Sequence, residues 1–218
     1  MRYNNHHISD FSRILCLKKD MVIIMKEIDY NFLKELLKSR LNEKRYKHSL
    51  AVADEARRLA AKYGADEEKS YLAGLLHDIT KNSPREEHLN IFNTFGIILD
   101  DVENNSEKLW HAVSGAAFVR NILKIDDEQI VDAIRYHTTA RADMPLLSKI
   151  LYLADFTSAD RDYDDVDVIR ALVDKSLNEA FVYALKYSIV DLVNCGRAVH
   201  TDTLKAYNQA VLKKTVKV

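Results

Sequence analysis

His77 and Asp78 are adjacent, end a leucine-rich stretch, and carry two side chains that commonly bind metal ions. Neighbouring helix positions point about 100° apart, so the two cannot both face the core, but both can reach an ion beside the end of a helix. Four more His or Asp residues lie in or beside apolar helical stretches: His48, His111, His137 and Asp155. Any one of these alone predicts an ordinary buried residue with a hydrogen-bond partner. Six in one chain predict a shared site, because a buried polar group without a partner is costly.

The donor types restrict the metal. Imidazole and carboxylate ligands suit iron, manganese, cobalt or zinc. The chain has only two cysteines, Cys16 and Cys195, which argues against a thiolate site and against a disulfide framework. A reducing, cytoplasmic compartment fits this cysteine usage. The residues alone leave open whether one ion binds or two.

The elements that position these residues are predicted to be helices, because apolar residues recur at helical spacing from residue 29 to the end and strand-like alternation is missing. Asp29 is a predicted N-cap, Gly64 a predicted end, and Asp66 the predicted start of the helix that leads to His77. We predict helices over residues 43–63, 106–123, 126–138, 145–158 and 176–195, and a last one from Thr201.

Two capping boxes are predicted, one at Ser83-Pro84-Arg85-Glu86 and one from Asp126 to Gln129. His88, on the short helix that follows the first, is predicted to be solvated. The acidic segment from Tyr163 to Asp167 lacks the ligand spacing and the glycine of a calcium loop, so we predict a solvated connection there.

The bulk properties describe one helical domain. The chain has 218 residues and a formal charge of −1, so no broad basic field predicts nucleic-acid binding. The apolar stretch from Met21 to Met25 is too short to cross a membrane and lacks the features of a secretory signal. We predict a leader at residues 1–25, upstream of a start at Met25, with a short ordered arm packed on the domain as the alternative. A single domain is predicted over residues 26–218.

Beyond these patterns, the chain resembles the HD-domain phosphohydrolase superfamily, and more narrowly the YqeK family of bacterial symmetrical diadenosine tetraphosphate hydrolases. The stretches that carry the resemblance are Arg45-Tyr46-Lys47-His48-Ser49, Ala73-Gly74-Leu75-Leu76-His77-Asp78 with Lys81, Trp110-His111-Ala112, Ala133-Ile134-Arg135-Tyr136-His137-Thr138-Thr139, Lys149-Ile150-Leu151-Tyr152-Leu153-Ala154-Asp155, and Gly196-Arg197 with His200 and Thr203-Leu204.

The resemblance implies an all-α HD-domain bundle in which His48, His77, Asp78 and Asp155 hold the principal iron. His111 and His137 would complete a second metal site or contact phosphates. Asp78, Lys81 and Arg161 would be the catalytic residues. The implied substrate contacts are His48, Lys81, Asn82, Ser83, Pro84, His111, His137, Thr138, Asp155, Arg161, Gly196, Arg197, His200 and Thr201.

The implied reaction is the splitting of diadenosine tetraphosphate into two ADP by a hydroxide that the metal activates. The alternatives are an HD phosphohydrolase for a mononucleotide, a cyclic dinucleotide or a guanosine polyphosphate, a nucleotide-binding module without turnover, and a di-iron oxygenase. A homodimer is one option for the assembly. The chain departs from the family pattern at Ser158-Ala159-Asp160, Ala140 and Tyr207, which puts the nucleotide preference in doubt but leaves every metal ligand in place.

Overall fold

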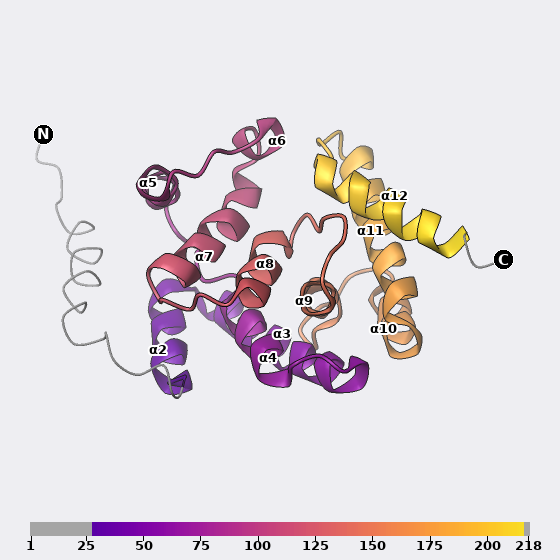
Figure 1. Cartoon of the computed structure of the whole chain (residues 1–218), viewed down its shortest axis with the longest axis horizontal. Coiled ribbons are helices and arrows are strands. Elements are labelled where there is room, and N and C mark those ends of the chain that lie inside the picture. Colours follow the sequence, from indigo (N-terminus) through magenta and orange to yellow (C-terminus); the bar gives the residue numbers. More distant parts are fainter. Residues whose placement is uncertain (1–27, 216–218) are drawn as a thin grey trace, which may run out of the picture. The chain divides into compact units, whose positions relative to one another are not determined.

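The structure is a computed structural model that describes residues 28–215. Its secondary structure over these residues is helical throughout, without a strand, so the predicted all-α class is confirmed (Figure 1). The chain divides into two compact units, residues 1–36 and residues 37–218, and the predicted site residues all belong to the second. The predicted leader at residues 1–25 lies outside the described residues, and the single domain over residues 26–218 stays a prediction.

The helices of the described chain follow one another in a simple order. They are α2 (Tyr30–Arg40), α3 (Glu43–Tyr63), α4 (Glu67–Leu76), α5 (Arg85–Phe95), α6 (Asp101–Asn104), the 3-10 helix η2 (Glu107–Leu109), α7 (Trp110–Asn121), α8 (Glu128–Tyr136), α9 (Leu146–Thr157), α10 (Val166–Lys175), α11 (Leu177–Asn194) and α12 (Thr201–Thr215).

Several predicted helix ends are confirmed. The sequence signal for each of them lies within a few residues of the helix end. Asp29 accepts hydrogen bonds of 3.0 Å from the backbone N–H groups of Asn31 and Phe32. Gly64 follows α3 with φ of 75°, a left-handed conformation that costs glycine little. Asp66 caps α4 through a hydrogen bond of 2.9 Å from the Lys69 N–H. These caps define the helices that carry His48 and lead to His77.

Other local predictions were wrong. Pro84 is the N-cap of α5 and not its first helical residue, and no side chain caps that helix. The cap of α8 is Asp127, one residue after the predicted Asp126, because its carboxylate receives the N–H groups of Gln129 and Ile130. Helix α10 begins inside the segment that we predicted to be a solvated connection.

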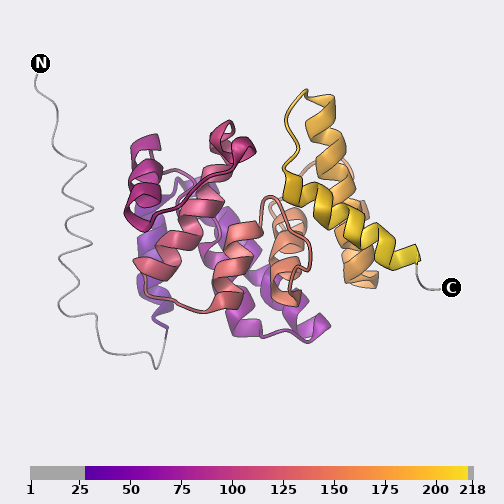
Figure 2. The same cartoon turned by 45° about the horizontal axis from the view of Figure 1, so that its top comes forward.

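Within the unit of residues 37–218, α9 packs against α3, α4, α8, α10 and α11 (Figures 1 and 2). Gly74 allows α3 and α4 to pack closely against each other. A Cβ on Gly74 would lie 2.7 Å from Ala53 Cα, so only glycine fits there without a shift. This close contact brings the end of α4, with His77, against the helix that carries His48.

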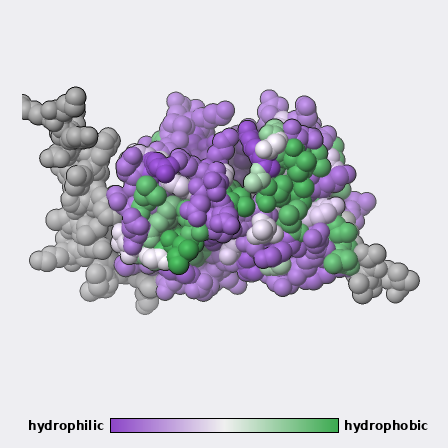
Figure 3. Space-filling view, turned by 90° about the horizontal axis from the view of Figure 1, so that it is seen from above, coloured by the Kyte–Doolittle hydropathy of each residue, from purple (hydrophilic) through white to green (hydrophobic). Residues whose placement is uncertain are grey.

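The surface of the described residues is mostly hydrophilic, and Figure 3 shows apolar residues gathered in separate patches on one face. Ile98 is the most exposed large apolar residue, with 94% of its surface accessible, and Val193 and Leu212 are also exposed. Among the described helices, none combines the length and the apolar character that a bilayer span requires.

Candidate metal centre

His77 and Asp78 lie at the point where α4 ends. His77 is the C-terminal cap of the helix, and Asp78 opens the turn that runs on to Asn82. Both side chains are buried, with 0% and 1% of the residue surface exposed. The two adjacent side chains at the helix end are therefore both directed into the interior.

One group of donors surrounds Asp155, near the end of α9. His48 Nε2 lies 2.9 Å from Asp155 Oδ1, and His77 Nε2 lies 4.0 Å from the same oxygen. His77 Nε2 is also 3.4 Å from Asp78 Oδ2. Two ligands at right angles on one transition-metal ion lie about 3 Å apart, since metal–ligand distances are about 2.1 Å. The spacing of His48 and Asp155 fits such an ion.

A second group surrounds the other oxygen of Asp78. His111 Nε2 lies 3.2 Å from Asp78 Oδ1, and His137 Nε2 lies 3.7 Å from it. The two imidazoles approach each other to 3.1 Å between their Nε2 atoms. Asp78 thus presents Oδ2 to one group of donors and Oδ1 to the other, the arrangement expected of a carboxylate that bridges two ions.

The hydrogen bonds of the histidines settle which nitrogen can bind metal, because a neutral imidazole has one N–H and one lone pair. His77 Nδ1 and His137 Nδ1 each lie 2.7 Å from a backbone carbonyl, of Gly74 and Ile134 respectively. His48 Nδ1 lies 2.8 Å from Asp160 Oδ2. These oxygens only accept, so Nδ1 donates in all three histidines, and in the neutral imidazole the lone pair is then on Nε2.

Two buried atoms of the site lack any hydrogen-bond partner, His77 Nε2 and Asp78 Oδ1. Such atoms are rare in folded proteins because an unpaired buried polar group is costly. Both atoms lie within 3.2 to 4.0 Å of donors described above. These two atoms and the Nε2 atoms of the three histidines fit a bound transition metal.

The carboxylates of the site are held ionised. Burial alone would raise the pKa of Asp78, but His77, His111 and His137 hold it well below its usual range. The pKa of Asp155 is likewise held well below its usual range, because Arg161 and His48 outweigh the effect of burial. Burial lowers the pKa of His111 to about 4, against the pull of Asp78. Anionic carboxylates beside a neutral imidazole are the protonation states that metal binding requires.

Three cationic side chains border these carboxylates. Arg45 Nη1 donates to Asp78 Oδ2 over 2.8 Å, and Arg161 Nη2 donates to Asp155 Oδ1. Lys81 Nζ lies 4.0 Å from Asp78 Oδ1 and 3.1 Å from His111 Nε2. Their side chains are 28%, 33% and 31% exposed, so all three also reach the solvent side of the site. A polyanion that approaches the donors would meet all three charges.

The predicted contacts that follow Lys81 lie in the turn before α5. Asn82 Oδ1 accepts from the Asn42 N–H over 3.0 Å, and Ser83 Oγ accepts from Arg40 Nη2 over 3.0 Å. Pro84 follows as the cap of α5. Thr138, just after His137, has a buried Oγ1 without a hydrogen-bond partner. Asn82, Ser83 and Pro84 thus follow Lys81 directly in the chain, and Thr138 follows His137.

The remaining predicted contacts lie between α11 and α12. Gly196 and Arg197 are exposed, Gly196 has φ of 62°, and Thr201 is the exposed first residue of α12. The structure gives the Arg197 side chain no contact with the donor groups. Helix α12, which follows the segment, is joined to the loop after α8, because Thr203 Oγ1 donates to the Thr139 carbonyl over 2.7 Å.

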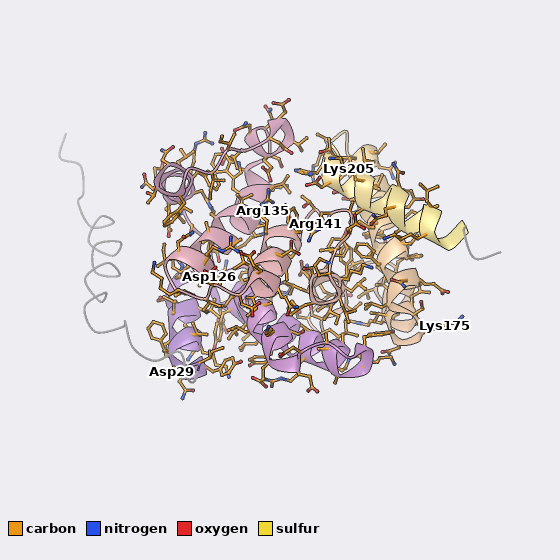
Figure 4. The ribbon with its side chains drawn as sticks, in the orientation of Figure 1. Asp29, Asp126, Arg135, Arg141, Lys175 and Lys205 are labelled. Carbon is orange, nitrogen blue, oxygen red and sulfur yellow. The ribbon has the colours of Figure 1, made fainter. Side chains whose placement is uncertain are left out.

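His200 is buried but belongs to a different cluster, with Asp100 and Glu103. Its Nδ1 accepts a hydrogen bond of 3.1 Å from the Asp202 N–H, so Nε2 carries the proton and has no lone pair for a metal. That Nε2 lies 2.9 Å from Asp100 Oδ2. Arg135, labelled on α8 in Figure 4, donates to Glu103 from the other side. His200 therefore fastens the start of α12 to the start of α6.

The prediction that His88 is solvated was wrong. His88 is buried, with 7% of its surface exposed, and not solvated. Its Nδ1 lies 2.8 Å from Ser114 Oγ, which in turn lies 2.9 Å from Thr80 Oγ1. Thr80 donates to the backbone carbonyl of His111. His88 thus belongs to a hydrogen-bonded chain that runs behind the metal donors.

The family model of the HD domain matches residues 45–160, more than half of the chain, and this range contains every proposed metal donor. This chain belongs to the HD-domain family. The resemblance predicted from the sequence is therefore confirmed at that level.

Relatives of this HD domain carry a common name. A Bacillus subtilis protein named symmetrical bis(5'-nucleosyl)-tetraphosphatase is 38% identical over 80% of this chain and 94% of its own length. A Staphylococcus aureus protein of the same name is 34% identical over 80% of this chain and 91% of its own length. The narrower resemblance is confirmed by these names.

The fold also has a solved counterpart. A crystal structure from Clostridium acetobutylicum, described as that of a predicted HD superfamily hydrolase involved in NAD metabolism, matches with a TM-score of 0.82 and 36% identity. The match covers 85% of this chain and 98% of that one.

Two residues of this HD domain's site were missed from the sequence, Arg45 and Asp160. Arg45 lies three positions before His48, which places both on one face of α3, and this spacing was a usable signal. Asp160 lies in an irregular segment after α9, where no periodicity predicts the direction of a side chain. Its contact with His48 follows only from the tertiary structure.

Proposed function

We propose that the chain is a metal-dependent phosphohydrolase that splits diadenosine tetraphosphate symmetrically into two ADP. The observation that carries the proposal is Asp78, whose two oxygens face two groups of His and Asp donors within reach of three cations. The names of the relatives support the substrate. The three cations favour hydrolysis over the oxygenase alternative, because oxygen activation does not need a contact with a polyanion.

We propose iron as the metal, with manganese, cobalt and zinc as the alternatives that the same donors suit. His48, His77, Asp78 and Asp155 would hold the principal ion, and His111 and His137 the second ion with Asp78 between the two. When bound, such an ion lowers the pKa of a water molecule toward neutrality and neutralises phosphoryl oxygens. The proposal assigns His111 to ligation and not to a charged phosphate contact, because burial keeps its imidazole neutral at pH 7.

The cations would hold the polyphosphate. A tetraphosphate bridge resists attack because its anionic oxygens repel a nucleophile, and positive side chains fixed beside the bridge reduce that repulsion. Lys81 and Arg161 would bind equatorial and leaving-group oxygens, Lys81 as a point charge and Arg161 through the edge of its planar guanidinium that Asp155 leaves free. The nucleotide would contact Asn82, Ser83, Pro84 and Thr138. Gly196, Arg197, His200 and Thr201 stay predicted substrate contacts, although the His200 side chain faces Asp100 and not the donor groups.

A substrate panel with product analysis tests the proposal. Purified protein reconstituted with Fe²⁺ is given diadenosine tetraphosphate, NAD, AMP and guanosine tetraphosphate, and the products are separated by chromatography. We expect ADP as the only early product from diadenosine tetraphosphate and much slower turnover of the rest. In ¹⁸O-labelled water, one ADP of each pair should carry the label.

The other results of this panel would each redirect the assignment. AMP plus ATP would mean cleavage away from the centre of the bridge. Preferred cleavage of NAD would agree with the NAD metabolism ascribed to the Clostridium protein and would overturn the tetraphosphate assignment. The predicted cytoplasmic location and homodimer stay predictions, and gel filtration of the same preparation tests the dimer.

A further inference from the structure

The three histidines whose tautomers are fixed differ in one respect. His77 and His137 donate through Nδ1 to backbone carbonyls of their own helices. His48 donates instead to the side chain of Asp160, which lies 112 positions further along the chain, and the distance between Nδ1 and Oδ2 is 2.8 Å. The orientation of His48 therefore depends on a residue that can be replaced without altering a helix.

Asp160 is itself fixed by its neighbours. Its second oxygen, Oδ1, accepts a hydrogen bond of 2.7 Å from Ser158 Oγ. Ser158 is fully buried, and its N–H donates over 2.9 Å to the carbonyl of Ala154 at the end of α9. Arg170 donates to the Ser158 carbonyl over 2.9 Å. Each oxygen of Asp160 thus has a separate partner, and the carboxylate cannot turn away from His48 without breaking one of these bonds.

We propose that Asp160 is a positioning residue that holds His48 with the lone pair of Nε2 directed at the metal, and that Ser158 holds Asp160 in place for this task. A carboxylate on the remote nitrogen of a metal-binding imidazole fixes its tautomer and increases its basicity. The pair lies in the segment where this chain departs from the family pattern, at Ser158-Ala159-Asp160. The inference rests on the metal role proposed for His48 and not on the identity of the substrate.

The test measures metal affinity without any substrate. Metal-free protein is titrated with Mn²⁺, and the free ion is followed by electron paramagnetic resonance. We expect Asp160→Ala to bind Mn²⁺ about 10- to 100-fold more weakly than the wild type, the usual effect of removing such an outer partner. Asp162→Ala is the matched control, because Asp162 is an exposed carboxylate of the same segment. It should bind as the wild type does.

A double-mutant cycle separates positioning from a general effect of charge. In a His48→Ala background, Asp160→Ala should cause no further loss of Mn²⁺ affinity, because the residue on which Asp160 acts is already gone. An equal loss in both backgrounds would overturn the proposal. So would an affinity of Asp160→Ala within about twofold of the wild type, a margin well below the usual effect.

Two more variants guard against a folding defect. Asp160→Asn keeps an oxygen that accepts from His48 but loses the charge, so its loss of affinity should lie between those of Asp160→Ala and the wild type. Ser158→Ala leaves Asp160 free to turn and should cause a smaller loss in the same direction. The temperature of thermal unfolding without metal should be the same for all of these variants. Wild-type Mn²⁺ affinity in both Asp160→Asn and Ser158→Ala would count against the proposal. A wrong substrate assignment would leave every one of these results unchanged.

Discussion

Arg45 and Asp78 form a hydrogen-bonded ion pair that joins α3 to the turn after α4, with 2.8 Å between Nη1 and Oδ2. The contact leaves the other oxygen of Asp78 facing His111 and His137. A buried carboxylate of this kind is stable only as long as it is paired, and Asp78 is almost fully buried. The charge of Asp78 is therefore the feature on which both donor groups depend.

Replacing Asp78 by asparagine tests this dependence. The amide keeps the shape but supplies neither the charge nor two equivalent oxygens, so we expect Asp78→Asn to lose most bound metal. Turnover should fall by at least about 100-fold, more than the loss of an outer partner causes. Mass spectrometry of the bound metal and the tetraphosphate assay measure the two effects. Asp54→Asn, an exposed carboxylate on α3, is the control. Full metal content with full turnover in Asp78→Asn would remove Asp78 from the site.

Lys81 offers the opposite test, since its charge should serve the substrate and not the metal. Lys81→Met keeps the apolar stem, so we expect normal metal content and a rate about 100-fold lower, as for the loss of one transition-state donor. Lys44→Met, at an exposed position on α3, should change neither quantity. Loss of metal in Lys81→Met would show instead that Lys81 supports the donor groups.

The close packing of α3 and α4 predicts opposite effects at two glycines. Gly74→Ala would place a Cβ 2.7 Å from Ala53 Cα, and backbone atoms cannot yield as a side chain can. We expect a loss of about 1–3 kcal/mol in the free energy of unfolding. Gly115→Ala, on α7, would meet nothing closer than 3.4 Å and should be neutral or stabilising by up to about 1 kcal/mol. Urea denaturation of the two variants checks this contrast, and equal stabilities would contradict it.

His88 predicts a pH dependence of stability. Burial lowers the pKa of His88 in the folded protein, against the charge of Glu87. Below about pH 6.5 the unfolded chain binds a proton that the folded chain resists, so stability falls as the pH falls. In His88→Gln this contribution is gone, and the free energy of unfolding should decline less between about pH 7 and pH 5. The two proteins differ only at position 88, so the difference between the two curves isolates His88, and parallel curves would contradict the prediction.

The sequence predicted helices well where the signal is local. The end at Gly64 and the caps at Asp29 and Asp66 each depend on a backbone conformation or a hydrogen bond within a few residues. Helix α10 was missed because an acidic segment precedes it, and Asp165, just before its first residue, has φ of 71°. A left-handed conformation is uncommon outside glycine, so the sequence did not mark the start of α10.

The residues of the candidate site were likewise predictable where the signal is local, and were missed where it depends on the tertiary structure. His48, His77, Asp78 and Asp155 were found as polar residues in apolar helical stretches, and the structure brings them together. The burial of His88 depends on which side of α5 meets α7, which a short helix does not reveal. Asp160 acts across 112 positions, and no pattern within the chain connects it with His48.

The positions of His48 and Asp155 have a consequence for the unfolded chain. The two residues are more than 100 positions apart in the sequence, yet their donor atoms are 2.9 Å apart. An ion held by both would act as a reversible cross-link that closes a loop of this length. Closing such a loop costs a flexible chain about 4 kcal/mol of conformational entropy. In the folded protein the loop is already closed before an ion binds, whereas the unfolded chain would have to close it on binding. The ion therefore binds the folded protein more tightly, and thermal unfolding should occur at a lower temperature when a chelator is present.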